Sequence, residues 1–248
     1  AMVPNARWIP YVIDQTYADE LVPTTGVIAQ AQAFDQAAQR YDLFIHTGAD
    51  HLAFATEDRF SDAVAALGNP VRVTDPGAFT YDWYPSLSSA ALGIGATGDY
   101  WLSGLAARDA SAGTVAGVLA GDAALPGRSV NAVRSGPALV TQPLPGTSTS
   151  LSWKLGAHPA AAPRMTLTLT DVSRLTVDSA AARLRTGRIS VRTDGPTRLT
   201  IAHLRRGTRV AVGGRRAATA GRSGRATVRL GPGVSVVKLT RSHPRGRE

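Results

Sequence analysis

Apolar and polar residues alternate along the N-terminal part of the chain in a way that predicts two strands and two helices. Residues 8–13 and 41–46 are short apolar runs rich in β-branched and aromatic side chains, and such runs are typical of buried strands. Residues 27–40 and 57–67 instead place apolar side chains at helical spacing. The order strand, helix, strand, helix predicts an α/β arrangement in which the two strands run parallel.

The two predicted helices differ in how they begin and in what they are expected to bury. Thr24 or Thr25 can cap the first helix, because a threonine hydroxyl accepts a hydrogen bond from an N–H group of the first turn. In the second helix, Phe60, Val64 and Leu67 lie on one side. We expect this apolar side to face the core.

The pattern changes in the middle of the chain. Residues 71–74 and 113–119 are further strand candidates, and residues 79–84 contain a cluster of aromatic side chains. Residues 136–150 are rich in proline, glycine, serine and threonine, which is typical of a linker or a long loop. The aromatic cluster is expected either to shape a substrate pocket or to pack between the two parts of the protein.

The C-terminal part contains six short segments in which apolar residues alternate with polar ones. Glycine, proline or aspartate separates many of them, and several short strands at regular spacing are typical of an antiparallel β-sandwich. The six segments are residues 166–170, 188–192, 198–202, 208–212, 226–230 and 235–239.

Charge divides the chain between the same two parts. Residues 1–150 carry 7 basic and 14 acidic side chains, whereas residues 151–248 carry 20 basic and 4 acidic side chains. Opposite net charge on two parts of one chain indicates separate domains. We therefore expect an α/β region over residues 1–70, a β-containing extension and linker over residues 71–150, and a basic β-sandwich over residues 151–248.

Composition argues against several kinds of site. The chain has no cysteine, which removes disulfides, thiol nucleophiles and cysteine-ligated metals. The five histidines lack the spacing of metal ligands, so neither a metal nor a cofactor is predicted. Residues 93–98 spell G-x-G-x-x-G without a suitable strand before them or a ribose-binding acid after them, so we predict a loop there. No apolar run is long enough for a transmembrane helix, and no signal peptide is recognised.

The strongest candidate chemistry follows the two predicted parallel strands. Asp19 stands in the sequence A-D-E-L-V-P between the first strand and the first helix, and His51 closes the sequence G-A-D-H after the second strand. Loops that leave the carboxyl ends of neighbouring parallel strands meet at one edge of the sheet, so we expect the two side chains to meet there. A carboxylate beside an imidazole can hold the ring so that its other nitrogen takes a proton from a nucleophile.

This pair of motifs resembles the end of the α/β-hydrolase fold, in which an aspartate, often in a D-x-x-V-P context, and a histidine follow successive strands. The resemblance covers about residues 8–68 and implies a serine hydrolase in which Asp19 orients His51, which acts as general base and then as general acid. Asp50 and Glu20 are rival acids, but Asp50 adjoins the histidine and Glu20 leads into the helix, so Asp19 is preferred. Resemblance to large exported bacterial hydrolases with appended β domains implies an extracellular location.

The nucleophile that such a pair requires has no recognisable motif in this chain. A G-x-S-x-G turn should precede the acid, yet residues 127–131 and 221–225 both lack its final glycine. We therefore expect the serine to lie in a missing N-terminal hydrolase portion or in another chain, unless the pair is vestigial. This segment alone is expected to be inactive, and the expected substrate is an ester or an amide.

A non-catalytic interaction module is the competing interpretation. No phenylalanine, tyrosine or tryptophan follows Trp153, which argues against binding nucleic-acid bases by stacking. A basic sandwich could instead bind an anionic polymer, or its arginines could simply be the outward positions of a soluble sandwich. The arginines considered for such a surface are Arg183, Arg185, Arg188, Arg192 and Arg198.

Overall fold

Strands predominate in the computed structural model of the chain. It describes residues 3–48, 50–53, 56, 60–67, 76–95, 97–109, 113–120, 130–132, 146–152 and 163–241. The described residues contain fifteen β-strands and two α-helices, and strands take up 47% of these residues against 17% for helices. The predicted fold class, a partial α/β-hydrolase followed by an all-β sandwich, is therefore wrong. The described part of the chain is mostly β, and each of the three sheets that it contains mixes parallel and antiparallel pairs.

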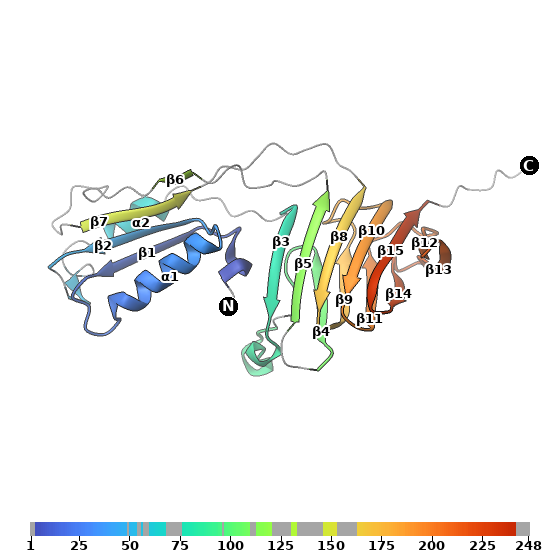
Figure 1. Cartoon of the computed structure of the whole chain (residues 1–248), viewed down its shortest axis with the longest axis horizontal. Coiled ribbons are helices and arrows are strands. Elements are labelled where there is room, and N and C mark those ends of the chain that lie inside the picture. The colour runs from blue at the N-terminus through green and yellow to red at the C-terminus, as the bar shows by residue number, and fades with distance from the viewer. Residues whose placement is uncertain are drawn as a thin grey trace, which may run out of the picture. The chain divides into compact units, whose positions relative to one another are not determined.

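The chain divides into two compact units, and Figure 1 labels their elements. The α/β unit comprises Val3–Val73 and Pro126–Gly156. The sandwich unit includes Thr74–Leu125 and Ala157–Glu248. The region expected to be an extension and linker, residues 71–150, is thus divided between the two units.

The sheet of the α/β unit is built around one parallel pair. β1 (Tyr11–Thr16) and β2 (Tyr41–His46) pair in parallel along their whole length. β7 (Gly146–Ser152) pairs antiparallel with β2, and β6 (Val130–Ala132) pairs with β7, so the order is β1-β2-β7-β6. Part of the predicted linker therefore supplies a strand, which is one reason why a purely parallel sheet was the wrong expectation.

α1 (Thr24–Gln36) provides the crossover that a parallel pair of strands requires. It buries Ala31 and Phe34 against the sheet. The Phe34 ring lies between two tyrosines of the strands, with centroid distances of 5.1 Å to Tyr11 and 5.7 Å to Tyr41. These aromatic contacts fix the helix on the parallel pair.

The start of α1 differs from the predicted start. Thr24 is the first helical residue instead of a cap, and the N-cap position is Pro23. The Thr24 hydroxyl donates to the carbonyl oxygens of Thr16, at 3.0 Å, and Tyr17, at 3.1 Å. The first turn of the helix is thereby tied to the end of β1.

The side of α2 (Ser61–Leu67) that faces inward differs from the one predicted. Phe60, Val64 and Leu67 are 41%, 63% and 59% exposed, whereas Asp62 is 0% exposed. The expectation that the apolar side faces the core is therefore wrong. Asp62 faces inward, where its carboxylate is 4.0 Å from the ring of a buried histidine at the end of β2.

The remaining elements belong to the sandwich unit, apart from one short helix. The strands of its larger sheet are β3 (Ala78–Trp83), β5 (Gly113–Ala120), β8 (Arg164–Thr170), β10 (Gly187–Thr193), β12 (Arg209–Val212), β13 (Arg215–Thr219) and β15 (Gly233–Thr240). Those of the smaller sheet are β4 (Leu102–Ala107), β9 (Val172–Asp178), β11 (Thr197–Ala202) and β14 (Ala226–Leu230). Short 3-10 helices are Val3–Ala6 in the α/β unit, and Pro85–Leu87 and Ala90–Leu92 in the sandwich unit. None of the helices in the described residues has the length and apolar character to cross a membrane.

The sandwich has two layers, which Figure 1 shows one behind the other. The seven-stranded sheet has the order β13-β12-β15-β10-β8-β5-β3, and the four-stranded sheet has the order β14-β11-β9-β4. All six predicted strands are present, as β8, β10, β11, β12, β14 and β15. The expected antiparallel arrangement is wrong in two places, because β8 is parallel to β10 and β9 is parallel to β11.

These parallel pairs arise because four consecutive strands, β8 to β11, alternate between the two sheets. β9 follows β8 after the single residue Asp171, whose φ of 53° lies in the left-handed region. That conformation redirects the chain into the other sheet. Strands that are neighbours in one sheet are therefore two apart in sequence and run in the same direction.

The predictions for the middle region have different outcomes. The strand expected at residues 113–119 is present as β5, whereas the one expected at residues 71–74 lies outside the described residues. The aromatic cluster of residues 79–84 belongs to the sandwich unit. There the Phe79 ring packs against the Trp101 ring at a centroid distance of 4.8 Å.

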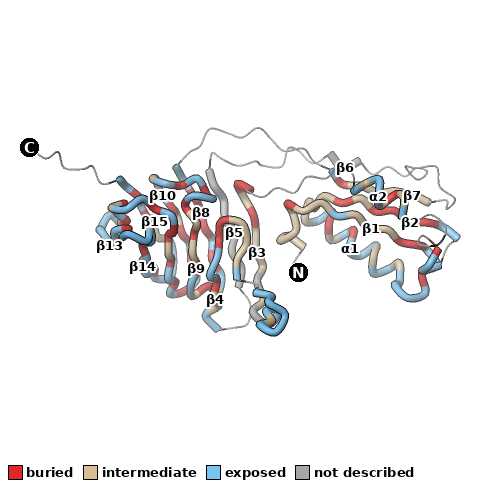
Figure 2. Tube along the Cα trace, turned by 180° about the vertical axis from the view of Figure 1, so that it is seen from behind, coloured by how far each residue is buried: buried red, intermediate tan, exposed pale blue. Residues whose placement is uncertain are grey.

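The core of the sandwich consists of inward-facing residues at alternating positions. Leu167, Leu175, Ile189, Leu199 and Ile201 are all 0% exposed. Figure 2 shows buried positions along β8, β9 and β10, and exposed positions along β13. Burial of each such side chain contributes about 1.5–3 kcal/mol, so this alternation is what holds the two sheets together.

Truncation of one inward-facing side chain should measure this contribution. Leu167→Ala should lower the free energy of unfolding by roughly 2–5 kcal/mol, because it leaves a cavity between the sheets. Thr166→Ala is the matched control on the same strand, since Thr166 is exposed, and it should cost less than about 1 kcal/mol. Urea unfolding measures both, and equal losses would contradict the assignment of the core.

Candidate active site

Asp19 lies in the loop between β1 and α1, with its carboxylate turned inward. The side chain is 1% exposed. Its Oδ1 atom accepts hydrogen bonds from the backbone N–H groups of Leu21, at 2.9 Å, and Val22, at 2.7 Å. An aspartate that accepts from N–H groups two and three residues ahead folds the chain into a tight turn. The sequence D-E-L-V-P thus holds its carboxylate in a fixed position.

His51 lies in the loop after β2 and contacts this carboxylate with its ring. The Nδ1 atom of His51 is 2.9 Å from Oδ2 and 3.0 Å from Oδ1 of Asp19. Because β1 and β2 are parallel, their following loops leave the sheet at the same edge. The structure therefore brings together the two residues that the sequence motifs select, and the His51 side chain is 31% exposed.

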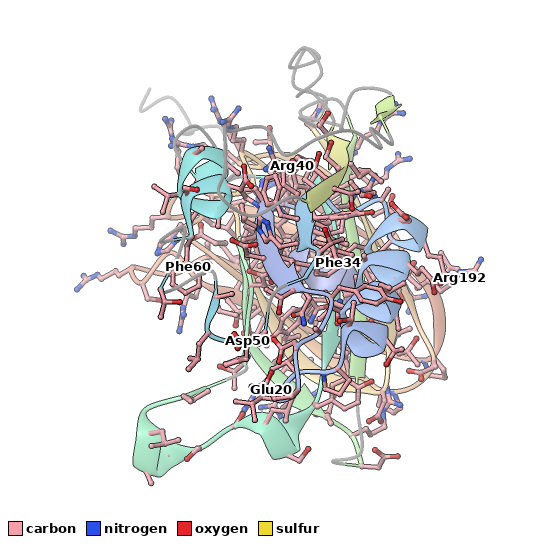
Figure 3. All side chains as sticks on the ribbon, turned by 90° about the vertical axis from the view of Figure 1, so that its left-hand side faces the viewer. Glu20, Phe34, Arg40, Asp50, Phe60 and Arg192 are labelled. Atoms are coloured by element: carbon pink, nitrogen blue, oxygen red, sulfur yellow. The ribbon has the colours of Figure 1, made fainter. Side chains whose placement is uncertain are left out.

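The rival acids, Asp50 and Glu20, bind backbone groups of the same loops. Oδ1 of Asp50 accepts from the N–H groups two and three residues ahead, both at 3.0 Å. Oε2 of Glu20 accepts from the backbone N–H of His51 at 3.2 Å. Figure 3 shows Glu20 and Asp50 close together at this edge. These two carboxylates shape the loop that carries the histidine, whereas the Asp19 carboxylate contacts its ring.

Two opposing effects act on the pKa of Asp19. Burial of the carboxylate raises its pKa, but the hydrogen bonds that it accepts outweigh this effect. Hydrogen bonds from the Val22 N–H, the His51 ring and the Leu21 N–H, together with attraction to the His51 ring, hold the pKa of Asp19 below the usual 3.8. The carboxylate is therefore ionised at neutral pH and can stabilise a positive charge on the ring.

A second aspartate–histidine pair lies on β1 and β2 themselves, five residues before Asp19 and His51 along the chain. His46 is the last residue of β2, and its Nε2 atom is 2.8 Å from Oδ1 of Asp14 in β1 and 4.0 Å from Oδ2 of Asp62 in α2. The side chains of His46 and Asp62 are 1% and 0% exposed. We call these three residues the inner cluster. Within the described part of the chain, no group of three or more histidine and carboxylate side chains could hold a metal ion, the inner cluster included.

Sequence reasoning missed the inner cluster, although the sequence contains a signal for it. Asp14 and His46 are the polar residues that follow or close two apolar runs, and buried polar groups require partners. The prediction ended the first strand at residue 13, whereas β1 continues to Thr16 and thereby includes Asp14. The third member, Asp62, was hidden because the apolar side of its helix was expected to face the core.

The glycine-rich residues 93–98 have a context unlike that of a nucleotide-binding loop. They follow the 3-10 helix Ala90–Leu92 and precede the strand β4. Ser89 and Ile94 exchange backbone hydrogen bonds of 2.8 and 2.9 Å. Residues 89–94 therefore form a turn closed by backbone hydrogen bonds, and the described residues that follow lead into the strand β4 instead of a helix.

Comparison with known proteins finds no matching family model, curated protein or solved structure. The resemblance of the motifs around Asp19 and His51 to those of α/β-hydrolases therefore stays a prediction. The geometry of these residues is what supports a functional proposal.

Acid titration should reveal the contribution of Asp19. Because its folded pKa is lowered, its contribution to stability is present above the unfolded pKa of 3.8 and is lost as the pH falls through the folded pKa. Asp19→Asn does not titrate, so over this acid range it should lose less stability than the wild type. Urea unfolding at a series of pH values measures both curves, and parallel curves would contradict the lowered pKa.

Replacement of His46 should show how much the inner cluster contributes. His46→Asn removes the ring between the buried carboxylates of Asp14 and Asp62, and should lower the free energy of unfolding by about 3–5 kcal/mol. His203→Asn is the matched control, because Nδ1 of His203 is also 2.8 Å from an oxygen of Asp178 but its side chain is 65% exposed. The control should cost less than about 1 kcal/mol. Equal losses would show that burial does not determine the effect.

Proposed function

We propose that Asp19 and His51 are the acid and the histidine of a serine hydrolase that cleaves an ester or amide bond. The observation that carries the proposal is the contact of both Asp19 oxygens with Nδ1 of His51, at 3.0 and 2.9 Å. The carboxylate keeps the ring proton on Nδ1, so that Nε2 takes a proton from a serine hydroxyl. Nε2 then returns the proton to the leaving group, and His51 acts as base and acid in turn.

The difference in burial between the two side chains suits these roles. The side chain of Asp19 is 1% exposed and that of His51 is 31% exposed, so a substrate can reach the ring while the acid stays shielded. In the inner cluster, the side chains of His46 and Asp14 are 1% and 8% exposed. A ring buried to that extent cannot exchange a proton with a bound substrate. For this reason we assign catalysis to Asp19 and His51, which we call the outer pair.

Exposed apolar side chains on the same two loops support a partner at this site. Clustered apolar residues on a protein surface mark places where another molecule binds. Those on the loops that carry the pair are Tyr17, Leu21, Val22 and Leu52, which are 69%, 67%, 44% and 61% exposed. In our proposal, the portion of the hydrolase that bears the nucleophile, together with the substrate, covers this surface.

The serine nucleophile belongs to a polypeptide segment outside these residues, because no G-x-S-x-G motif occurs in the sequence. An N-terminal hydrolase portion or a separate chain would supply it. Export from the cell is part of the same proposal, and it is supported by the resemblance to exported hydrolases with appended β domains.

The proposal predicts that this chain alone hydrolyses p-nitrophenyl acetate no faster than its His51→Ala variant. Combined with the portion that supplies the serine, the chain should become active. His51→Ala should then lower kcat/KM by roughly 10³–10⁴-fold, and Asp19→Asn should act similarly because asparagine favours the wrong ring tautomer. The absorbance of released p-nitrophenol measures each rate.

Asp50→Asn is the matched control, because Asp50 is an acid of the same loop that binds backbone N–H groups. It should lower kcat/KM by less than about tenfold. Hydrolysis by the chain alone that disappears in His51→Ala would overturn the placement of the nucleophile outside the chain. Full activity of His51→Ala in the combined enzyme would overturn the whole proposal.

A further inference from the structure

Three arginines form a row across the outer face of the four-stranded sheet of the sandwich. Arg198 of β11 lies opposite Arg174 on its parallel neighbour β9 and opposite Arg229 on its antiparallel neighbour β14. All three residues are exposed. Neighbouring strands are about 4.8 Å apart, so the three guanidinium groups share one short stretch of surface. We call these residues the arginine row.

The charges of the arginine row are not balanced by nearby acids. Like charges directly opposite each other on neighbouring strands repel. Among the described residues, none of the three arginines forms a salt bridge with a carboxylate. The acids that precede β9 and β11, Asp171 and Asp194, have oxygens 3.7 and 2.9 Å from the guanidinium group of Arg108 instead. The positive charge of the row is therefore available to an anionic ligand.

The arginine row also lines a pocket of about 380 Å³. Ser173 and Thr197 contribute to its wall, together with Ala106, Pro196 and Leu230. A concave surface and concentrated positive charge therefore coincide on this face. Such a combination raises the local concentration of anions and holds them in contact with the protein.

We propose that this pocket binds the phosphate groups of a linear polymer. Each guanidinium group presents paired N–H donors that match two oxygens of a phosphate. Because the row crosses three strands, it can contact successive phosphates along a chain. The polymer needs no bases, since bases bind by stacking on aromatic rings and none of the described residues that line the pocket is aromatic.

This site is separate from the proposed hydrolase chemistry and does not depend on it. It also differs from the surface that the sequence suggested, because only Arg198 of the five arginines considered there belongs to the row. The sandwich contains a built-in comparison. On the outer face of the seven-stranded sheet, Arg188 lies opposite Arg164 and Lys238 in the same three-strand register, and all three are exposed. These three residues, the control row, do not line the 380 Å³ pocket.

The test compares the two rows in the full chain. Fluorescence anisotropy measures the affinity for a labelled short linear polyphosphate as the sodium chloride concentration rises. R174S/R198S/R229S should weaken binding at least about tenfold and reduce the slope of log affinity against log salt by about two. R164S/R188S/K238S carries the same change in net charge and should weaken binding less than about threefold.

Thermal unfolding without ligand checks that the variants fold, and polyphosphate should raise the Tm of the wild type more than that of R174S/R198S/R229S. If either triple variant fails to fold, the single variants Arg198→Ser and Arg188→Ser make the same comparison. They replace the central residue of each row.

Four outcomes would overturn the proposal. Equal losses of polyphosphate affinity in the two triple variants would show that the polymer is attracted to the basic unit as a whole. They would exclude the pocket as the binding site. Competition by orthophosphate as strong as that by polyphosphate would exclude a polymer. Stronger competition by heparin would exclude phosphate as the preferred group, and stronger competition by oligothymidylate would exclude a polymer without bases.

Discussion

The parallel pairing of β1 and β2 is the constraint on which the candidate active site depends. Because the strands pair along their whole length, the chain leaves both of them at the same edge of the sheet. Asp19 and His51 follow at that edge, and in each of their loops two backbone N–H groups donate to a carboxylate, that of Asp19 in the first loop and that of Asp50 in the second. A parallel pair needs a crossover, and α1 provides it. The bonds from Thr24 to the end of β1 then place the start of that helix beside the acid loop.

The inner cluster strengthens this constraint from within. His46 connects Asp14 of β1 with Asp62 of α2, so one buried ring links both strands of the parallel pair and the second helix. A slip of one residue in the pairing would turn the side chains of one strand to the opposite face and break these contacts. The inner cluster is therefore suited to holding the register between β1 and β2. The outer pair is more exposed and is suited to exchanging protons. In our proposal, the same two residue types serve two roles because burial differs between them.

In the sandwich unit, strand register creates the arginine row, a surface that no local sequence motif predicts. Arg174, Arg198 and Arg229 are far apart in sequence, yet parallel pairing on one side of β11 and antiparallel pairing on the other place them in one row. The alternation of β8 to β11 between the sheets is what makes β9 and β11 neighbours. The charge of this unit is visible in the composition, whereas its concentration at one pocket depends on the topology.

Local patterns in the sequence determined the elements and the outer pair of residues. The strand at residues 41–46 agrees with β2, the six alternating segments became strands, and the order of the motifs selected Asp19 and His51. Such features depend on neighbouring residues, whose spacing can be read along the chain. The tertiary structure alone decided the mixed sheets, the inward side of α2 and the arginine row. These depend on contacts between distant residues, such as β7 against β2 or Asp62 against His46, and local periodicity contains no information about those partners.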